Sequence, residues 1–416
     1  MEPEQPFVAL LFTTFPKISE TFLQRDVEAL LAGGWRIRLY SLWGGGGEFR
    51  GHRIRTFNKW RLIPLFLFII PWNAVRRPRI VLDLLAGAIS RRAPAWLNFW
   101  ENMLGAGFAG CFYREFGRDP PALVHAAWAG APATAAWLLG RILGLPYSTG
   151  AHAYDLYEHG GDWWLMEKVA AARFVQTSTE VARRELLSRG ADPSRVHVIR
   201  RGLNSWPELK PLRRARHPVR LVCVARLVPK KGLFGQLRIY AALQKAGVEF
   251  EARIIGDGPL RDALAGEISR HGLADRVALL GQQPHAEVWR QLDWADVLLH
   301  TGIVAPNGDR DGLPNVIPEA MAAGVLVVSS PVSATVEAVL PDKTGLLAAV
   351  DSPESWVDAI RSLTADDERA ERLRGNARRW VEANYDARRN AARLVALFER
   401  VAPALKAPGK VEADPS

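Results

Sequence analysis

The feature that most constrains this chain is an alternation of apolar strands and amphipathic helices that begins near residue 7. Residues 7–13 form a continuous apolar run, typical of a strand buried on both faces of a parallel sheet. A stripe of leucine and valine then predicts a helix, which Thr21 and Gln24 open as a capping box. Residues 36–42 predict a second strand. Because a strand, a helix and a strand in succession form a parallel unit, we expect functional loops after the strand ends.

The alternation continues in two series, which indicates two domains. At 416 residues the chain is too long for one ordinary core. A stretch rich in proline and charge, residues 204–218, separates the two series. We therefore predict two Rossmann-like, doubly wound α/β domains with parallel sheets, followed by a C-terminal amphipathic helix. The predicted parts are a first domain (1–205), a linker (206–218), a second domain (219–385), a C-terminal helix (386–405) and a disordered tail (406–416).

Composition and charge narrow the classes of protein and partner. Hydrophobic content of 48% and charged content of 24% describe a soluble globular protein. Cys111 and Cys223 suggest no disulfide framework, and the acidic first residues lack the basic region of a signal peptide, so we expect a cytoplasmic protein. The net charge of +10 fits nucleic acid, an anionic membrane or phosphorylated substrates. Because the basic residues are scattered, with no aromatic–basic pattern, we expect no nucleic-acid partner.

One apolar segment, residues 62–72, has basic residues on both sides. It is too short to span a bilayer, which needs about 20 residues. Its basic flanks, its bulky apolar side chains and Trp72 favour a segment that lies on an anionic membrane surface. The alternative is a buried helix with solvated basic ends. The flanking residues are Arg53, Arg55, Lys59 and Arg61 on one side and Arg76, Arg77 and Arg79 on the other.

In the second domain, candidate ligand-binding residues follow successive predicted strands. Arg226 and Lys231 come after the strand at 220–225, where two cations can hold a diphosphate. Gly256 and Gly258 follow the next strand, in a Gly-Asp-Gly-Pro turn that lets the backbone approach a ligand closely. Each motif alone is weak, since such residues usually lie on a solvated face or in a simple turn. Their order on successive strand ends favours a binding site.

A third motif places Asp311 and Glu319 on either side of a Gly-Leu-Pro turn. Asn315 is the expected N-cap of the following helix, Pro318 falls in its first turn, and Gly324 ends it. A helix start of this kind suits a phosphate, and the two carboxylates would bind hydroxyl groups of a sugar or ribose. The alternative is a surface turn and a capped helix with incidental acids.

Together these motifs resemble a GT-B glycosyltransferase of family 4. In the first domain, residues 15–22, 125–129 and 151–155 are similar to the exopolysaccharide and colanic-acid-type members of that family. The resemblance covers nearly the whole chain. It implies that the two domains face a cleft and that the C-terminal helix packs back on the first domain. It also implies that the second domain binds a nucleotide-diphosphate-sugar donor and that the first binds the acceptor.

The resemblance also implies roles for individual residues. Arg226 and Lys231 match the pair that neutralises the leaving diphosphate, and Glu319 matches the acid that holds the ribose. The implied donor-binding residues are Arg226, Lys231, Gly256, Gly258, Asp311, Gly312, Leu313, Pro314 and Glu319. The implied catalytic residues are His152, Asp311, Arg226 and Lys231. On the acceptor side we expect Lys17, Ser19 and Glu20, which follow the first strand, together with His125 and Asp155.

Members of this family retain the anomeric configuration and usually need no metal, since the cations do a metal's electrostatic work. No side-chain nucleophile is identifiable, which favours a same-face displacement over a covalent intermediate. We therefore expect no cofactor, a saccharide or polyprenyl-linked saccharide as acceptor in polysaccharide biosynthesis, and a peripheral position on the inner face of the cell membrane.

Two departures from the family pattern keep alternatives open. Asp311 stands where the family usually has Glu, and only Glu337 remains of a common Gly-Gly-x-Pro-Glu pattern at residues 333–337. The alternatives are a nucleotide-sugar epimerase or sugar phosphorylase of the same plan, and a non-catalytic member that binds glycan or acts as a scaffold.

Overall fold

The structure is a computed structural model with two compact units, each built on its own sheet. It describes residues 6–17, 20–57, 60, 62–64, 67–68, 70–79, 82, 93–212 and 218–405. Unit 1 comprises Met1–Ser178, Ala182–Gly202 and Ala387–Ser416, and unit 2 comprises Thr179–Val181 and Leu203–Asp386. Ser19, Lys59, Arg61 and the tail after residue 405 lie outside the described residues.

The sheet of unit 1 has the strand order β3-β4-β2-β1-β5-β6-β7-β8. Its pairs are parallel apart from the antiparallel pair of β3 and β4. The central strand β1 is buried along its whole length, as its continuous apolar run predicts. The strands are β1 (Val8–Phe12), β2 (Ile37–Ser41), β3 (Gly47–Phe49), β4 (His52–Thr56), β5 (Leu123–Ala126), β6 (Tyr147–Gly150), β7 (Val175–Thr177) and β8 (Val196–Val198).

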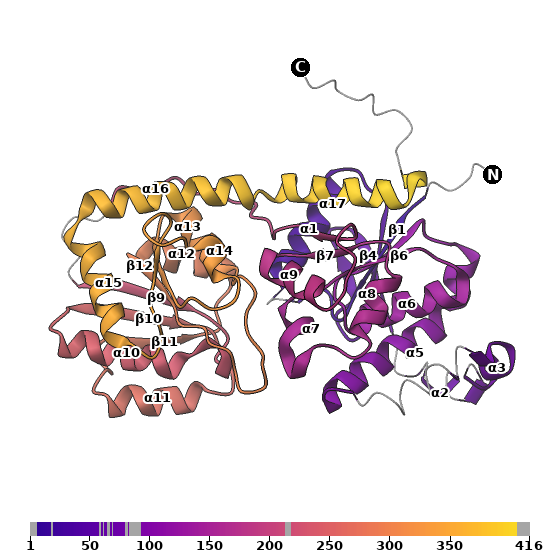
Figure 1. The fold of residues 1–416 in the computed structure, drawn as a ribbon, viewed down its shortest axis with the longest axis horizontal. Helices are drawn as coiled ribbons and strands as arrows, with labels where there is room; N and C mark the ends of the chain where they lie inside the picture. The colour runs from indigo at the N-terminus through magenta and orange to yellow at the C-terminus, as the bar shows by residue number, and fades with distance from the viewer. Residues whose placement is uncertain are drawn as a thin grey trace, which may run out of the picture. The chain divides into compact units, whose positions relative to one another are not determined.

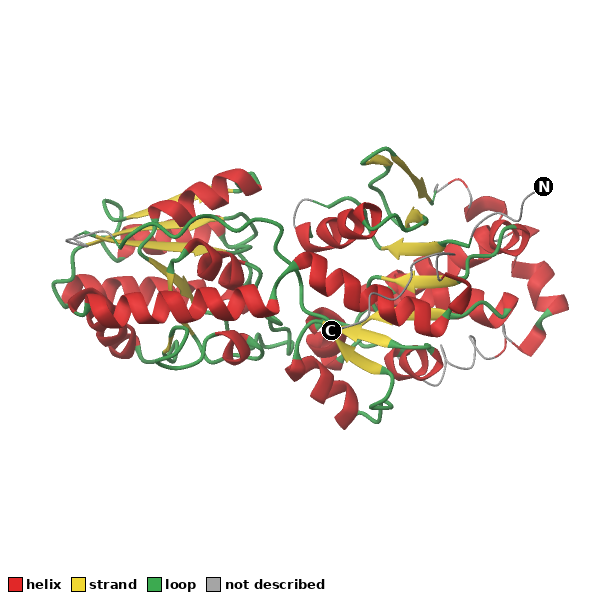
Figure 2. Cartoon of the chain, turned by 90° about the horizontal axis from the view of Figure 1, so that it is seen from above, coloured by secondary structure: helices red, strands yellow, loops and turns green. Residues whose placement is uncertain are grey.

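Helices cover both faces of this sheet (Figure 2). Val8, Leu10 and Phe12 point to one face and pack with α1 and α17, while Ala9 and Leu11 point to the other and pack with α5 and α6. The C-terminal helix α17 therefore packs on the first domain, as predicted. The helices are α1 (Thr21–Ala32), α2 (Leu62–Pro64), α3 (Ile70–Arg76), α5 (Trp96–Arg118), α6 (Ala131–Leu143), α7 (Ala153–Tyr157), η3 (Glu158–Gly160), α8 (Leu165–Ala171), α9 (Glu180–Ser188), α17 (Ala387–Val401) and η5 (Pro403–Leu405).

Unit 2 has a parallel sheet with the strand order β11-β10-β9-β12-β13-β14. Helices α10, α11 and α15 pack on one face, and α12, α13, α14 and α16 pack on the other (Figure 1). The strands are β9 (Val219–Val224), β10 (Phe250–Ile255), β11 (Val277–Gly281), β12 (Val297–His300), β13 (Leu326–Ser329) and β14 (Leu346–Leu347). The helices are η4 (Pro229–Lys231), α10 (Leu233–Lys245), α11 (Arg261–Arg270), α12 (His285–Trp294), α13 (Val316–Ala323), α14 (Thr335–Ala338), α15 (Pro353–Ala365) and α16 (Asp367–Asn384). The two doubly wound parallel sheets confirm the predicted fold class.

The caps of two helices differ from the sequence expectation. Helix α1 has Glu20 at its N-cap without a side-chain cap bond, and Gln24 Nε2 instead donates to the Lys17 carbonyl, 3.0 Å away. Asn315 occupies the N-cap position of α13, also without a side-chain cap bond. The C-terminal end of α13 is as predicted, because Gly324 adopts the left-handed conformation with φ 75°.

Helix α5 is absent from the sequence prediction. In its first turns, the usual arrangement of buried apolar and exposed polar side chains is inverted. Its buried residues include Asn98 and Asn102, whereas Trp96, Leu97 and Trp100 are exposed. In these first turns a buried polar network replaces the apolar stripe that predicts a helix. Further along, Phe108, Phe112 and Phe116 recur every fourth residue and enter the core of unit 1, a helical signal that sequence reasoning missed.

The apolar segment with basic flanks is exposed where the structure describes it. Trp72 is 50% exposed and Val75 is 81% exposed, so a buried helix is wrong for these residues. The other exposed apolar side chains in or near the segment are Trp60, Ile63, Leu67, Phe68 and Leu82. None of the described helices combines the length and the apolar character that crossing a bilayer requires.

Arg53 and Arg55 are not flanks of that segment. They lie in strand β4, and Arg55 forms an ion pair with Glu115 of α5. Arg76, in contrast, stacks on Trp72, with its guanidinium carbon 4.5 Å from the ring centroid.

Candidate functional site

The strand ends of unit 2 bring most of the predicted donor residues to one edge. Strands β10, β9, β12 and β13 are parallel neighbours, so the loops that follow them leave from the same side of the sheet. The loop after β9 carries Arg226 and Lys231, the loop after β10 carries Gly256, and the loop after β12 carries Asp311. This edge is called the donor edge below.

Lys231 and Asp311 form an ion pair at the donor edge. Lys231 Nζ lies 2.6 Å from Asp311 Oδ2, and both side chains are largely buried. Burial alone would raise the pKa of Asp311, but the charge of Lys231, the His300 ring and Lys230 together hold its pKa well below the usual range. Asp311 is therefore a carboxylate at any physiological pH, and its charge is matched by cations of the protein.

Lys230 is a second buried cation that sequence reasoning missed. Its Nζ lies 2.9 Å from Asp309 Oδ1 and 3.8 Å from Asp311 Oδ1. The two adjacent lysines thus pair with two acids that are two residues apart. The repeated Lys-Lys and Asp-x-Asp spacing could have revealed this double pairing in the sequence.

His300, the last residue of β12, is also a residue that sequence reasoning missed. Its Nδ1 lies 3.0 Å from Ser329 Oγ, and its Nε2 lies 3.7 Å from Asp311 Oδ2. Burial lowers the pKa of His300, so the ring is neutral in this state.

Glu319 lies in the first turn of α13, as predicted. It is only 5% exposed, and its Oε1 lies 3.2 Å from His285 Nε2. A carboxylate here sits near the positive end of the helix dipole, which stabilises its negative charge. His285, at the start of α12, is the exposed partner of the buried Glu319 carboxylate.

The structure supplies a reason for Gly256 and Gly258 that differs from the expected approach of a ligand. A Cβ on Gly256 would lie 1.9 Å from the Ala225 carbonyl oxygen, and one on Gly258 would lie 2.6 Å from the Leu227 carbonyl oxygen. The two glycines therefore let this turn pack directly against the loop that carries Arg226. The two glycines thereby help to position the loop of Arg226.

The remaining predicted donor residues differ in which of their groups are exposed to solvent. The Arg226 side chain is exposed, and among the described residues no ion pair holds it. Leu313 and Pro314 are buried in the core of unit 2, so of the Gly-Leu-Pro turn only the backbone near Gly312 is left to meet a ligand.

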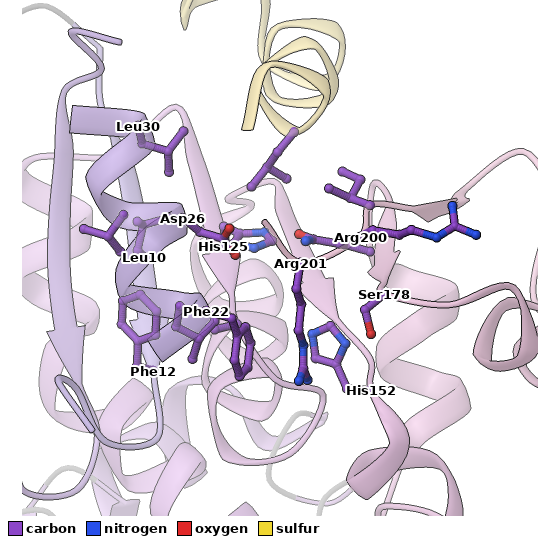
Figure 3. Close-up of a pocket in the computed structure, with 16 residues that line it drawn as sticks. Leu10, Phe12, Phe22, Asp26, Leu30, His125, His152, Ser178, Arg200 and Arg201 are labelled. Carbon is purple, nitrogen blue, oxygen red and sulfur yellow. The ribbon is translucent and has the colours of Figure 1, made fainter. Parts of the chain in front are cut away.

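Unit 1 contains a separate small cavity of about 30 Å³, room for one or two waters (Figure 3). His125 and His152 both line it, from the ends of β5 and β6. Burial lowers the pKa of His125 to about 4, and burial together with Arg201 and His125 lowers the pKa of His152 to about 3. Both rings are therefore neutral at pH 7. The Nδ1 atom of His152 has no hydrogen-bond partner among the described residues.

Asp26 is a further lining residue that sequence reasoning missed. It lies on α1, and its carboxyl group turns toward the cavity, where the side chain of Arg201 runs beside His152 (Figure 3). Burial raises the pKa of Asp26 to about 7, although the charges of Arg201 and Arg25 act in the opposite direction. The helix pattern hid this residue, because one acid among the polar positions of α1 is unremarkable in sequence.

Asp155 is not turned toward the cavity but fixes the loop of His152. Its Oδ2 accepts a hydrogen bond of 2.9 Å from the His152 backbone N–H, and burial raises its pKa to about 7. Behind it lies Lys168, which is 0% exposed and forms an ion pair with Asp162. This pair joins Asn98, Asn102 and Thr134 in a polar network that holds α5 and α6 together.

Lys17 and Glu20 lie in the loop after β1 and form an ion pair of 2.8 Å with each other. Neither lines the cavity of His125 and His152. Among the described residues, no group of three or more His, Cys, Asp or Glu side chains could hold a metal ion.

Two doubly wound units, one with cations and carboxylates gathered at its strand ends, define a protein of the GT-B class. Comparison with family models gives the same class for both halves. Residues 19–205 match the model of "Glycosyltransferase Family 4", and residues 206–380 match "Glycosyl transferases group 1". The chain is 31% identical over 405 residues to the amylovoran biosynthesis glycosyltransferase AmsK of Erwinia amylovora, covering 93% of this chain and 98% of AmsK. The chain therefore belongs to the family 4 glycosyltransferases.

Other relatives and solved structures agree with this assignment. The putative colanic acid biosynthesis glycosyltransferase WcaL of Escherichia coli is 36% identical over 159 residues, which are 38% of this chain and 39% of WcaL. The crystal structure of HepE from Anabaena in complex with UDP has a TM-score of 0.70 at 16% identity, covering 95% of this chain and 100% of HepE. Sucrose-phosphate synthase from Thermosynechococcus elongatus has a TM-score of 0.73 at 17% identity, covering 96% and 100%. At these identities the structural likeness shows the fold alone.

Proposed function

We propose that this chain is a retaining glycosyltransferase of exopolysaccharide biosynthesis. It moves a sugar from a nucleotide-diphosphate-sugar donor to a saccharide or polyprenyl-linked saccharide acceptor. The observation that carries the proposal is the donor edge, where Lys231 is held 2.6 Å from Asp311 while Arg226 remains exposed and Glu319 stands at a helix start. The likeness to AmsK and the UDP bound to HepE support this choice of pathway and donor class.

At the donor edge the roles divide by charge. Arg226 and Lys231 bind the diphosphate and stabilise the charge that builds up on it as it leaves. Glu319 accepts hydrogen bonds from the ribose hydroxyls, and Asp311 with the backbone near Gly312 binds the sugar. The turn of Gly256 and Gly258 supports the loop of Arg226, as its contacts with Ala225 and Leu227 indicate.

Retention of configuration follows from a same-face displacement. The acceptor hydroxyl attacks the anomeric carbon on the face from which the diphosphate departs, and a diphosphate oxygen takes the hydroxyl proton. Asp311 is a poor candidate for a covalent nucleophile, since Lys230 and the His300 ring also lie beside its carboxylate and remain there when Lys231 binds the diphosphate. This supports a mechanism without a glycosyl-enzyme intermediate.

The acceptor belongs to unit 1 in this proposal. His152 is held at the end of β6 by Asp155, and its neutral ring can accept a hydrogen bond from the acceptor hydroxyl. His125 also lines the cavity, and its Nδ1 lies 2.9 Å from Ser148 Oγ. The loop of Lys17, Ser19 and Glu20 follows β1 and would contact the acceptor further out.

The exposed apolar segment supports a membrane-bound acceptor. Trp60, Ile63, Leu67, Phe68, Trp72 and Val75 are exposed, and Arg76 and Arg79 are exposed beside them. Apolar side chains next to basic ones fit an anionic bilayer surface, in which the apolar groups enter the headgroup region. A peripheral position on the inner face of the membrane would bring the enzyme to a lipid-linked acceptor.

A thermal-shift screen against UDP, GDP and their common sugars tests the donor class. A ligand at 100 times its dissociation constant stabilises the fold by about 2.7 kcal/mol, which raises the melting temperature measurably. Incubation of the stabilising sugar nucleotide with and without a lipid-extract acceptor, followed by NMR of the product anomer, then tests the reaction. Transfer with an inverted anomer would reject the retaining mechanism. Turnover without acceptor to an isomerised sugar nucleotide would favour an epimerase, and binding without any turnover would favour a scaffold.

A further inference from the structure

His300 has an orientation that its hydrogen bonds define. Its ring is 5% exposed, and its Nδ1 lies 3.0 Å from Ser329 Oγ. Ser329 donates its only hydroxyl hydrogen to the Ser330 carbonyl, 3.1 Å away. Ser329 Oγ must therefore accept from His300, so the proton of the neutral ring sits on Nδ1 and Nε2 carries a lone pair.

The Nε2 atom of His300 is buried without a hydrogen-bond partner among the described residues. It faces Asp311, whose Oδ2 lies 3.7 Å away. The contact of Nδ1 with Ser329 Oγ holds the ring in this orientation, and Gly302 leaves room for it, since a Cβ there would lie 2.6 Å from His300 Cε1. A lone pair that faces a carboxylate is unfavourable, and one proton on Nε2 would turn this contact into a charged hydrogen bond.

While Lys231 is paired with Asp311, its positive charge compensates the carboxylate, so His300 stays neutral. Two charged groups act on His300, Lys231 from η4 and Asp311 from the loop after β12, and Lys230 lies one step further, beside Asp311. The charge of Lys231 lowers the pKa of His300 and the charge of Asp311 raises it. If Lys231 moves away from Asp311, the balance shifts toward the protonated ring.

We propose that His300 is a positioning residue, which replaces Lys231 as the partner of Asp311 when Lys231 turns to the donor diphosphate. The exchange takes up one proton from solvent at His300 Nε2 and breaks no covalent bond. Asp311 then keeps its place for the donor sugar instead of following Lys231. This inference rests on the proposed function, because it requires a diphosphate at the donor edge.

Calorimetry of UDP binding at pH 6.5, in buffers with different ionisation enthalpies, tests the proton uptake. GDP is titrated in parallel. A histidine with an ordinary pKa is half protonated at this pH, so we expect the wild type to take up about half a proton more than His300→Asn. The proton change of the nucleotide itself is common to both proteins and cancels in the comparison. His271→Asn, at the end of α11, is the matched control and should behave as the wild type.

Hydrolysis of UDP-glucose and GDP-mannose tests the positioning. Gln can place an N–H near the position of Nε2, whereas the shorter Asn places its amide near Nδ1. We expect His300→Asn to lower kcat/KM about 10-fold to 100-fold with nucleotide affinity changed less than about 2-fold, and His300→Gln to recover much of the loss. Melting temperatures show whether each variant is folded.

The outcomes separate this inference from the proposed function. If the wild type binds neither nucleotide, the proposed donor edge fails and this inference fails with it. If nucleotides bind but His300→Asn matches the wild type in proton uptake and turnover, only the role of His300 is overturned. Equal losses in His300→Asn and His300→Gln, with equal loss of nucleotide affinity, would also overturn it, since that pattern marks a merely structural residue.

Discussion

Lys231 and Asp311, two residues expected to bind different parts of the donor, form an ion pair with each other, with Nζ and Oδ2 2.6 Å apart. The pair keeps both charges compensated in a largely buried place, where an unpaired charge would be costly. If both residues bind the donor as proposed, the donor replaces this contact by its own contacts with each of them.

Replacing Lys231 by Ala should remove a cation that stabilises the leaving diphosphate. We expect kcat to fall about 10²-fold to 10³-fold, as for the loss of one preorganised donor at other enzyme sites. Steady-state turnover of the nucleotide sugar measures this. Lys245→Ala, an exposed lysine at the end of α10, should leave turnover unchanged. Turnover of Lys231→Ala within 3-fold of the wild type would contradict the proposed role, provided that its melting curve is cooperative.

Glu319→Gln should weaken recognition of the ribose while keeping the shape of the side chain. We expect nucleotide affinity to fall about 10-fold, because hydrogen bonds to a charged group contribute about 1.5–3 kcal/mol. The wild type should also prefer UDP over its 2′,3′-dideoxy analogue, and the variant should lose that preference. If the variant discriminates as the wild type does, Glu319 does not hold the ribose. His285→Asn shows whether its contact with Glu319 matters separately.

Asp26→Asn should change how stability depends on pH. Burial raises the pKa of Asp26 to about 7, above its value in the unfolded chain, so between about pH 4 and pH 7 the native state binds more protons than the unfolded state. Wild-type stability is therefore lost as pH rises through this window, and the variant avoids the loss. We expect the variant to gain about 2 kcal/mol on the wild type between pH 5 and pH 8, at about 1.4 kcal/mol per pKa unit.

Urea unfolding at both pH values measures this difference for Asp26→Asn. Glu28→Gln, on the same helix and paired with Arg50 at the surface, is the control and should show no comparable pH dependence. A constant difference between wild type and Asp26→Asn at the two pH values would rule out a raised pKa.

Arg76→Glu combined with Arg79→Glu should weaken binding to anionic vesicles. Each basic residue near such a surface contributes about 1 kcal/mol, so the double reversal should weaken binding more than about 10-fold. Sedimentation with phosphatidylglycerol vesicles measures this, and phosphatidylcholine vesicles should bind less in both cases. Trp72→Ser with Val75→Ser should reduce the salt-resistant part of binding, and Trp43→Ser, an exposed tryptophan elsewhere in unit 1, should not. Wild-type protein that stays in the supernatant at low salt would reject a membrane surface here.

Much of the fold could be predicted because its strands and helices depend on patterns of residues close in sequence. The continuous apolar run of β1 and the helix that ends at Gly324 depend on residues close in sequence, and both lie where the sequence places them. The first turns of helix α5 could not be predicted, because Asn98 and Asn102 are buried by partners from distant parts of the chain. Arg55 likewise lies in a strand because β4 pairs with β2, where Tyr40 is its partner.

The sequence by itself determined which residue types follow the successive strands of unit 2, because that order depends only on the chain, and the motifs there resemble those of family 4 glycosyltransferases. Which of these residues meet was decided by the tertiary structure. The fold joins Lys231 to Asp311 across 80 residues and turns His300 and Ser329 toward each other from neighbouring strands. It also encloses Asp26, a residue of α1, where removal from water changes its pKa. Charge pairing and desolvation act through space, so the spacing of the lysines and acids could suggest a pairing, but only the fold decides which atoms meet.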